Sequence, residues 1–166
     1  LLAERQNLDG SIVLATMEGA RPLLVEIPAL VNPTNFGYPK RTASGFDLNR
    51  LNLLVAVLEK RTKLKLADKD IYVNVVGGLK LNDPAADLAV AMAIASASAG
   101  RSLDEGAVVF GEIGLGGEVR SATNWQARIK EAKKLGFTYA IAPKVHKDKF
   151  IKGVSDMRQA LIDYLQ

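Results

Sequence analysis

The stretch Asn82-Asp-Pro-Ala-Ala-Asp-Leu-Ala-Val-Ala-Met-Ala-Ile-Ala95 decides the fold of this chain. It opens with Asp83 and Pro84, which favour the N-cap and the first position of a helix, so we expect a helix from Ala85 to about Ala97. Because this helix is apolar almost all round, it must lie inside the protein rather than on its surface. Its many alanines also let neighbouring backbones approach closely. We therefore predict that it is the central buried helix.

The segments around this helix alternate between strand patterns and helix patterns. Two β-rich runs flank Gly19 and predict a hairpin, and apolar residues recur at helical spacing from Leu48 to Leu58, after a favourable N-cap at Asp47. The predicted strands are residues 11–18, 21–31, 71–76, 107–110, 117–119 and 139–142, and the other predicted helices begin near residues 47, 124 and 156. Residues 32–45 are expected to form a loop or an irregular strand pair. The pattern predicts one mixed domain that contains both α-helices and β-strands.

Length and composition indicate one globular domain. A chain of 166 residues fits a single domain, and we expect residues 11–166 to form it, with residues 1–10 as the end of a linker from an upstream module. No segment has the roughly 18 to 20 uncharged apolar residues of a membrane span, and the first residues lack the pattern of a signal peptide. We therefore expect a cytoplasmic protein with no membrane partner. The absence of cysteine excludes disulfides and thiol chemistry.

Two features that could suggest a chemical site have simpler interpretations. The glycine-rich segment Gly111–Val119 matches neither the dinucleotide-binding nor the P-loop spacing, so a tight hairpin is expected there. The single histidine, His146, lies among lysines in a predicted loop, so we expect it on the surface rather than in a catalytic triad. A zinc site built on histidine and cysteine is also excluded. We expect neither a metal nor a cofactor in this chain.

Around residues 77–95 and 109–135, the chain resembles the proteolytic domain of the Lon protease. The nucleophilic serine of Lon lies in Asp-Gly-Pro-Ser-Ala-Gly, which corresponds to residues 82–87, so Ala85 stands at the serine position. The catalytic lysine of Lon corresponds to Gln126. A methyl group cannot attack a carbonyl, and a neutral amide cannot accept the proton. The resemblance implies a Lon-like α+β fold, with a small mixed sheet and helices mainly on one side, but no proteolysis.

The resemblance is closer still to the C-terminal domain of the RadA (Sms) family of bacterial DNA-repair proteins. It rests on residues 17–23, 36–45, 49–61 and 83–91 together, whereas residues 120–128 are poorer in arginine than the family pattern. The resemblance implies a noncatalytic scaffold that supports ring assembly, as a hexamer in the parent protein, and contributes DNA contacts in recombinational repair and branch migration. ATP, magnesium and zinc are expected only in upstream domains of that DNA-dependent ATPase.

Basic residues supply the candidate DNA contacts. The excess of 22 Lys+Arg over 18 Asp+Glu permits an anionic partner. Lys40 and Arg41 share a predicted loop with Phe36 and Tyr38, a combination that suits single-stranded nucleic acid or a protein interface. The predicted contacts to single-stranded or branched DNA are Lys40, Arg41, Arg120, Arg128, Lys130, Lys133 and Lys134. Repetition around a ring would add such weak contacts together.

Two alternatives remain open from the sequence. The first is a residual Ser/Lys peptidase that uses another serine, such as Ser121 with Lys130. The second is an interaction module that recruits a repair partner without touching DNA. The loop with Lys40 and Arg41 distinguishes the two hypotheses, because its basic side chains contact DNA only in the scaffold hypothesis.

Overall fold

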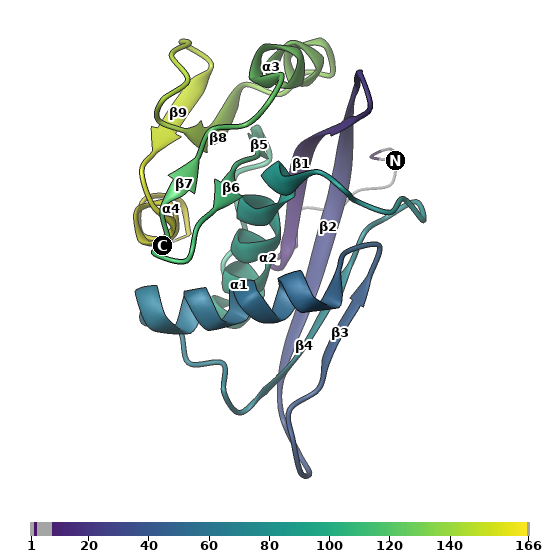
Figure 1. Cartoon of the computed structure of the whole chain (residues 1–166), viewed down its shortest axis with the longest axis vertical. Helices are drawn as coiled ribbons and strands as arrows, with labels where there is room; N and C mark the ends of the chain where they lie inside the picture. The colour runs from purple at the N-terminus through teal and green to yellow at the C-terminus, as the bar shows by residue number, and fades with distance from the viewer. Residues whose placement is uncertain (1, 3–7, 166) are drawn as a thin grey trace.

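The computed structural model describes residue 2 and residues 8–165. Its main sheet has seven strands, which are β1 (Ser11–Glu18), β2 (Arg21–Pro33), β3 (Arg41–Ser44), β4 (Lys69–Asn74), β5 (Ala107–Val109), β8 (Tyr139–Pro143) and β9 (Ile151–Val154). Their order across the sheet is β3-β4-β2-β1-β5-β8-β9 (Figure 1). Strand β2 runs antiparallel to β1 and β4, and the other neighbouring pairs are parallel. The sheet is therefore mixed, as predicted.

A second, two-stranded sheet forms the hairpin expected in the glycine-rich segment. Strand β6 (Glu112–Ile113) pairs antiparallel with β7 (Val119–Arg120). The turn between them closes through a hydrogen bond from the Gly117 amide to the Gly114 carbonyl, at 2.9 Å. The prediction of a hairpin at this position is confirmed.

Four α-helices complete the α+β fold, which confirms the predicted class. They are α1 (Leu48–Arg61), α2 (Asp87–Ala99), α3 (Trp125–Lys134) and α4 (Met157–Tyr164). Helices α1, α2 and α4 contact one another, whereas α3 packs against β1, β2 and β8 near one end of the molecule (Figure 1). No helix in the described part of the chain is long and apolar enough to cross a membrane.

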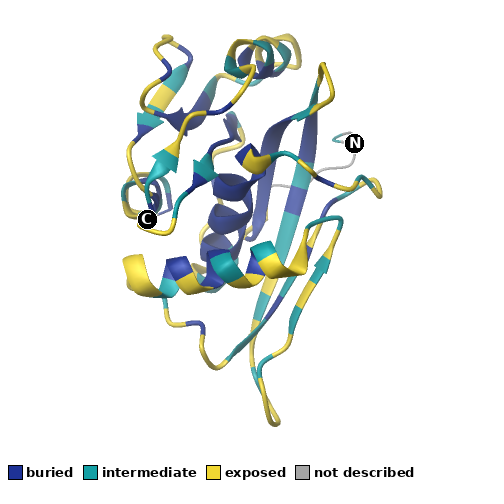
Figure 2. Cartoon of the chain, viewed as in Figure 1, coloured by how far each residue is buried: buried dark blue, intermediate teal, exposed yellow. Residues whose placement is uncertain are grey.

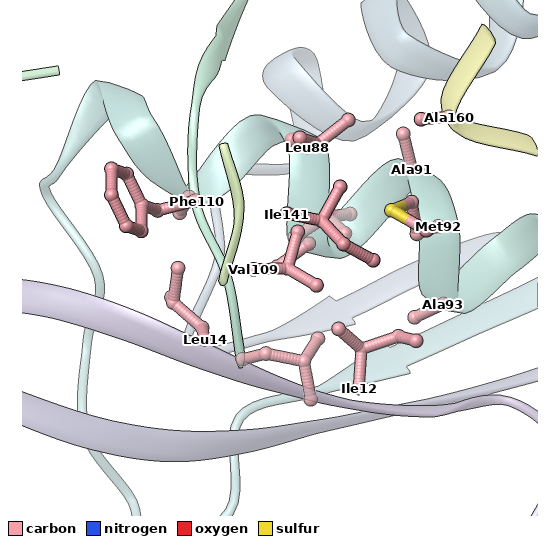
Figure 3. Close-up of a cluster of buried hydrophobic side chains, with 14 of the residues drawn as sticks. Ile12, Leu14, Leu88, Ala91, Met92, Ala93, Val109, Phe110, Ile141 and Ala160 are labelled. Atoms are coloured by element: carbon pink, nitrogen blue, oxygen red, sulfur yellow. The ribbon is translucent and has the colours of Figure 1, made fainter. Parts of the chain in front are cut away.

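Helix α2 is the centre of the core, as its sequence predicts. Every residue from Asp87 to Ser96 is buried, whereas the faces of α1 and α3 turned away from the core are exposed (Figure 2). Its alanines allow β1 to pack closely, and Ile12 and Leu14 point toward it from the sheet (Figure 3). The helix ends at Gly100, whose left-handed φ of 66° suits glycine.

The start of α2 differs from the prediction. The Asp83 carboxylate caps a 3₁₀ turn, Pro84–Ala86, and the α-helix begins only at Asp87. Short 3₁₀ turns are frequent at the N-termini of α-helices. A tertiary contact also holds this turn, because the Ala85 carbonyl accepts a hydrogen bond from the Gly111 amide at 2.8 Å.

The segment predicted as a loop or irregular strand pair contains parts of two regular strands. Strand β2 continues to Pro33, and β3 occupies residues 41–44. The two strands do not pair with each other, because β4 lies between them and pairs with both. Residues 34–40 form the connecting loop, which projects at the lower end of the molecule in Figure 1.

Candidate functional site

The position that corresponds to the Lon nucleophile holds a buried methyl group. Ala85 is 2% exposed and lies in the 3₁₀ turn before α2. Its amide donates to the Asp83 carboxylate at 3.0 Å, and its carbonyl accepts from the Gly111 amide. Gln126, at the other dyad position, is exposed on α3. Neither group supplies a nucleophile or a base.

A buried ion pair holds this turn from one side. Arg128 of α3 is fully buried, and its Nη1 and Nη2 donate to the two carboxylate oxygens of Asp83, at 2.5 and 3.1 Å. The same guanidinium donates to the carbonyls of Ala15 and Thr123, both at 2.9 Å. It also lies over the Phe110 ring, 5.5 Å from its centroid. Arg128 thus joins α3 to β1 and to the start of α2.

The Asp83 carboxylate accepts several further hydrogen bonds. Besides Arg128, the Thr16 hydroxyl donates to it at 2.9 Å and the Met17 amide donates to it at 3.3 Å. Burial alone would raise the pKa of Asp83, but the hydrogen bonds and charge of Arg128 outweigh it and hold that pKa below its usual range. The carboxylate is therefore ionised at neutral pH. A charged carboxylate cannot act as an acid, and all its contacts serve to hold structure.

A second ion pair, buried on its aspartate side, holds the turn from the other side. Asp87 is 1% exposed and accepts from both Nε and Nη2 of Arg50, on α1. It also accepts from the Ile113 amide of β6 at 3.0 Å, while Arg50 donates to the Ile113 carbonyl at 2.9 Å. The hydrogen bond with Asp87 raises the pKa of Arg50. This pair connects α1, α2 and β6.

Both aspartates stand where the Lon pattern Asp-Gly-Pro-Ser-Ala-Gly has glycine. Asp83 corresponds to the first of these glycines and Asp87 to the second. Here each of these two positions holds a carboxylate that binds an arginine from another helix. Sequence reasoning identified Asp83 only as an N-cap and missed the pairing of Asp87. The pairing of Asp87 could have been expected, because Asp87 is a charged residue in an otherwise apolar helix and buried charges are almost always paired.

A polar hollow of about 290 Å³ opens beside Asp83, between the β1–β2 turn and the start of α3. Glu18, Lys80, Asn82 and Thr123 are among its lining residues. Serine and histidine are absent from its lining, as is Ala85. The hollow therefore offers polar and charged contacts, but not the Ser and Lys positions of the Lon pattern.

The structure corrects the sequence interpretation of Arg128. We expected its side chain to decorate the surface of α3 together with the neighbouring lysines, as a candidate DNA contact. It is instead 0% exposed, and Asp83 neutralises its charge. Helical geometry explains the difference, because Arg128 shares the buried face of α3 with Ile129 and Ala132.

The expectation for His146 was also wrong, because its side chain is buried rather than on the surface. Its Nε2 accepts a hydrogen bond from the Ala122 amide at 2.9 Å, and its ring stacks on Trp125 with centroids 5.0 Å apart. The lysines around it in the sequence are exposed, so local composition gave no sign of its burial. His146 fixes the segment that leads into α3.

Stability should decrease in mild acid because of His146. Burial, with a smaller contribution from the charge of Arg128, lowers the pKa of His146 below its usual value near 6.5. The folded state therefore favours the neutral imidazole, so its contribution is complete above about pH 6.5 and decreases as the pH falls through the folded pKa. The urea midpoint should fall between about pH 7.5 and about pH 5. His146→Phe should flatten this dependence, and an unchanged slope in that variant would contradict the assignment.

The exposed candidates on α3 belong to a larger basic region. Lys133 contacts the β8–β9 loop through an ion pair with Asp148 at 3.7 Å, and its ammonium lies over the Phe150 ring. We call this region the lysine-rich end, and its exposed members are Lys130, Lys133 and Lys134 of α3 with Lys144, Lys147 and Lys149 of the loop. Sequence reasoning missed the three loop lysines. Their clustering around His146 was the available signal.

The remaining basic candidates lie outside the lysine-rich end. Lys40 is exposed, but the guanidinium of Arg41 donates to the Leu66 carbonyl at 2.9 Å, and Arg120 pairs with Glu118 at 2.8 Å. The loop that carries Lys40 projects at the lower end of Figure 1, whereas α3 and the β8–β9 loop lie at the upper end. The structure therefore places Lys40 and Arg41, Arg120, and the lysine-rich end in different parts of the molecule.

The proposed alternative dyad has no support from the geometry. Ser121 and Lys130 are both exposed, and no hydrogen bond of the Ser121 hydroxyl occurs within residues 8–165. An activated serine requires a base within hydrogen-bond reach in an enclosed site. The arrangement of these two side chains therefore does not favour a peptidase.

The chain is similar to known proteins over most of its length. Residues 50–146 match the family model described as subunit ChlI of Mg-chelatase. DNA repair protein RadA of Rickettsia bellii is 48% identical over 144 residues, covering 87% of this chain and 32% of that protein. The Halalkalibacterium halodurans RadA is 52% identical over 134 residues, covering 81% and 29%, and the Bacillus subtilis RadA is 46% identical over 159 residues, covering 92% and 35%. The resemblance to RadA is thereby confirmed, and the chain spans about a third of the length of these curated relatives.

Proposed function

Because this chain belongs to the family described as subunit ChlI of Mg-chelatase, and because relatives named DNA repair protein RadA match most of it, we propose that it is the noncatalytic assembly domain of a RadA-type DNA-repair protein. In this proposal, an upstream part of the parent protein is a DNA-dependent ATPase that binds ATP, magnesium and zinc. The domain orders the subunits of the parent protein into a ring, expected to be a hexamer, around single-stranded or branched DNA. The parent protein acts in the cytoplasm, in recombinational repair and branch migration.

The noncatalytic part of the proposal is supported by the packing around Ala85, the residue that corresponds to the Lon serine by resemblance. Ala85 is buried between two ion pairs, Asp83 with Arg128 and Asp87 with Arg50. These contacts fasten the start of α2 to α1, α3, β1 and β6. Contacts that hold this segment rigid favour a structural role, in which the domain fixes how neighbouring subunits are arranged.

The lysine-rich end supports a role in contacting DNA. Six exposed lysines lie there on α3 and the β8–β9 loop, with Asp148 paired to one of them. Lysines bind phosphates as point charges, and each phosphate contact releases condensed counterions. In a ring, the same modest region is repeated in every subunit, so weak contacts add along one DNA molecule.

Removal of the domain from the parent protein tests the proposal. A parent protein that lacks residues 11–166 should sediment as smaller species than the ring and should fail to restore resistance to DNA damage in a deletion strain. The matched variant Ala85→Ser, Gln126→Lys should assemble, complement the strain and leave unfolded protein uncleaved. Its buried position 85 and the two ion pairs leave the new hydroxyl inaccessible.

Two results would refute the proposal. Normal rings and full complementation without the domain would show that assembly resides elsewhere. Proteolysis by the unaltered parent protein, abolished by Ser121→Ala, would establish the peptidase alternative instead.

A further inference from the structure

The loop between β2 and β3 presents two aromatic side chains to solvent. Phe36 is 91% exposed and Tyr38 is 92% exposed, whereas every other aromatic residue of the chain is at least partly buried. Rings left in water contribute nothing to the core, because apolar burial is the main source of their stabilising effect. We call these two residues with Gly37 between them the aromatic tip. Its exposure points to a role in contact with another molecule.

The base of this loop is held firmly. One carboxylate oxygen of Asp70 accepts from the Thr34 hydroxyl at 2.9 Å and from the Lys40 amide at 2.8 Å. The Thr34 amide also donates to the Asp68 carbonyl at 2.8 Å. Both ends of the loop are therefore attached to the start of β4. The aromatic tip is presented from a fixed base, which lowers the entropy lost when it binds.

The chemistry of the tip suits bases rather than a broad protein surface. Residues 32–41 contain no acidic side chain, and Lys40 is exposed next to the rings. Aromatic faces stack on any unpaired base, and a neighbouring cation contacts the phosphates. A protein interface of ordinary size needs roughly 800 Å² on each partner, which is more than a projecting loop with two rings and one lysine offers.

We propose that Phe36 and Tyr38 form a stacking platform for unpaired bases of single-stranded nucleic acid, with Lys40 as its phosphate contact. The inference rests on the proposed function and adds to it the form of nucleic acid and the residues that select that form. Because paired bases in a duplex are already stacked on one another, the tip distinguishes single strands from duplexes. The lysine-rich end lies at the opposite end of the molecule (Figure 1). Its lysines carry no aromatic platform of this kind and would contact the phosphates of either form.

Binding of fluorescein-labelled oligo(dT) to this chain, followed by anisotropy, tests the proposal. Phe36→Ala, Tyr38→Ala should weaken binding by roughly tenfold or more for each ring removed. The slope of log affinity against log salt should stay unchanged, since no charge is altered, and duplex affinity should stay within about twofold. Tyr38→Phe should retain the affinity, because the ring acts and the hydroxyl does not. The matched control Leu115→Ala, Ile162→Ala removes exposed apolar side chains elsewhere and should bind like the unaltered chain.

A loss of binding in the double variant cannot come from unfolding. Both rings are almost fully exposed, so their removal should leave the unfolding temperature unchanged. Three results would overturn the proposal: an unaltered oligo(dT) affinity in the double variant, an equal loss for duplex, or no binding of oligo(dT) by the unaltered chain. Loss of self-association with retained oligo(dT) binding would identify the tip as a protein interface instead. All of these outcomes are separate from the ring-assembly and complementation tests, which decide the proposed function on their own.

Discussion

Replacing Arg128 with alanine is expected to lower the free energy of unfolding by about 3 to 5 kcal/mol. The substitution leaves the Asp83 carboxylate buried without its counter-charge, and it removes the donors to the carbonyls of Ala15 and Thr123. Such an effect is large against a typical total stability of about 5 to 15 kcal/mol. Urea unfolding at neutral pH, monitored through Trp125, measures it directly.

A double-mutant cycle measures the interaction energy of the Asp83–Arg128 pair apart from the other contacts of the two residues. Asp83→Ala with Arg128→Ala should cost clearly less than the sum of the two single variants, because the double variant buries no unpaired charge. Arg120→Ala is the matched control, since Arg120 pairs with Glu118 at the surface and its loss should cost less than about 1 kcal/mol. Additive losses in the cycle would mean that the pair does not hold the start of α2.

Reversing the charge of four residues in the lysine-rich end is expected to weaken DNA binding of the chain roughly a hundredfold or more at low salt. The variant changes Lys130, Lys133, Lys134 and Lys147 to glutamate, which replaces phosphate attraction with repulsion. The slope of log affinity against log salt should decrease by about 0.9 for each duplex phosphate that the variant no longer neutralises. Filter binding or anisotropy over a salt series measures both quantities.

The control for this prediction has the same change in net charge at other positions. It reverses Lys60, Lys63, Lys65 and Arg101, which are exposed and lie outside the lysine-rich end. DNA affinity should decrease much less in this control. Equal decreases in the two variants would show that only the overall charge matters, and the region would then have no specific role.

The fold could be predicted where the sequence carries a periodic or positional signal. Helix α2 follows from its alanine-rich pattern, the α3 helix from its spacing, and the β6–β7 hairpin from its glycines. The order of the strands could not be predicted in the same way. Nothing local indicates that β4 lies between β2 and β3, because strand neighbours are set by long-range packing.

The candidate site was predictable only in part, for the same reason. The alanine at position 85 could be singled out from the sequence, because the resemblance to Lon pairs it with the Lon serine. The ion pairs are not visible, since Arg128 lies 45 residues from Asp83 and Arg50 lies 37 residues from Asp87. A basic residue on a helix has the same appearance in the sequence whether it is exposed or buried. The three-dimensional structure shows that the arginine of α3 faces the core, whereas Lys130, Lys133 and Lys134 face solvent.

The two ion pairs also limit which residues positions 83 and 87 can accept. Glycine at either position would leave an arginine without its counter-charge, and the effect should be larger for the fully buried Arg128 than for the partly exposed Arg50. Sequence change at the start of α2 is thus opposed by the same contacts that keep the protein folded.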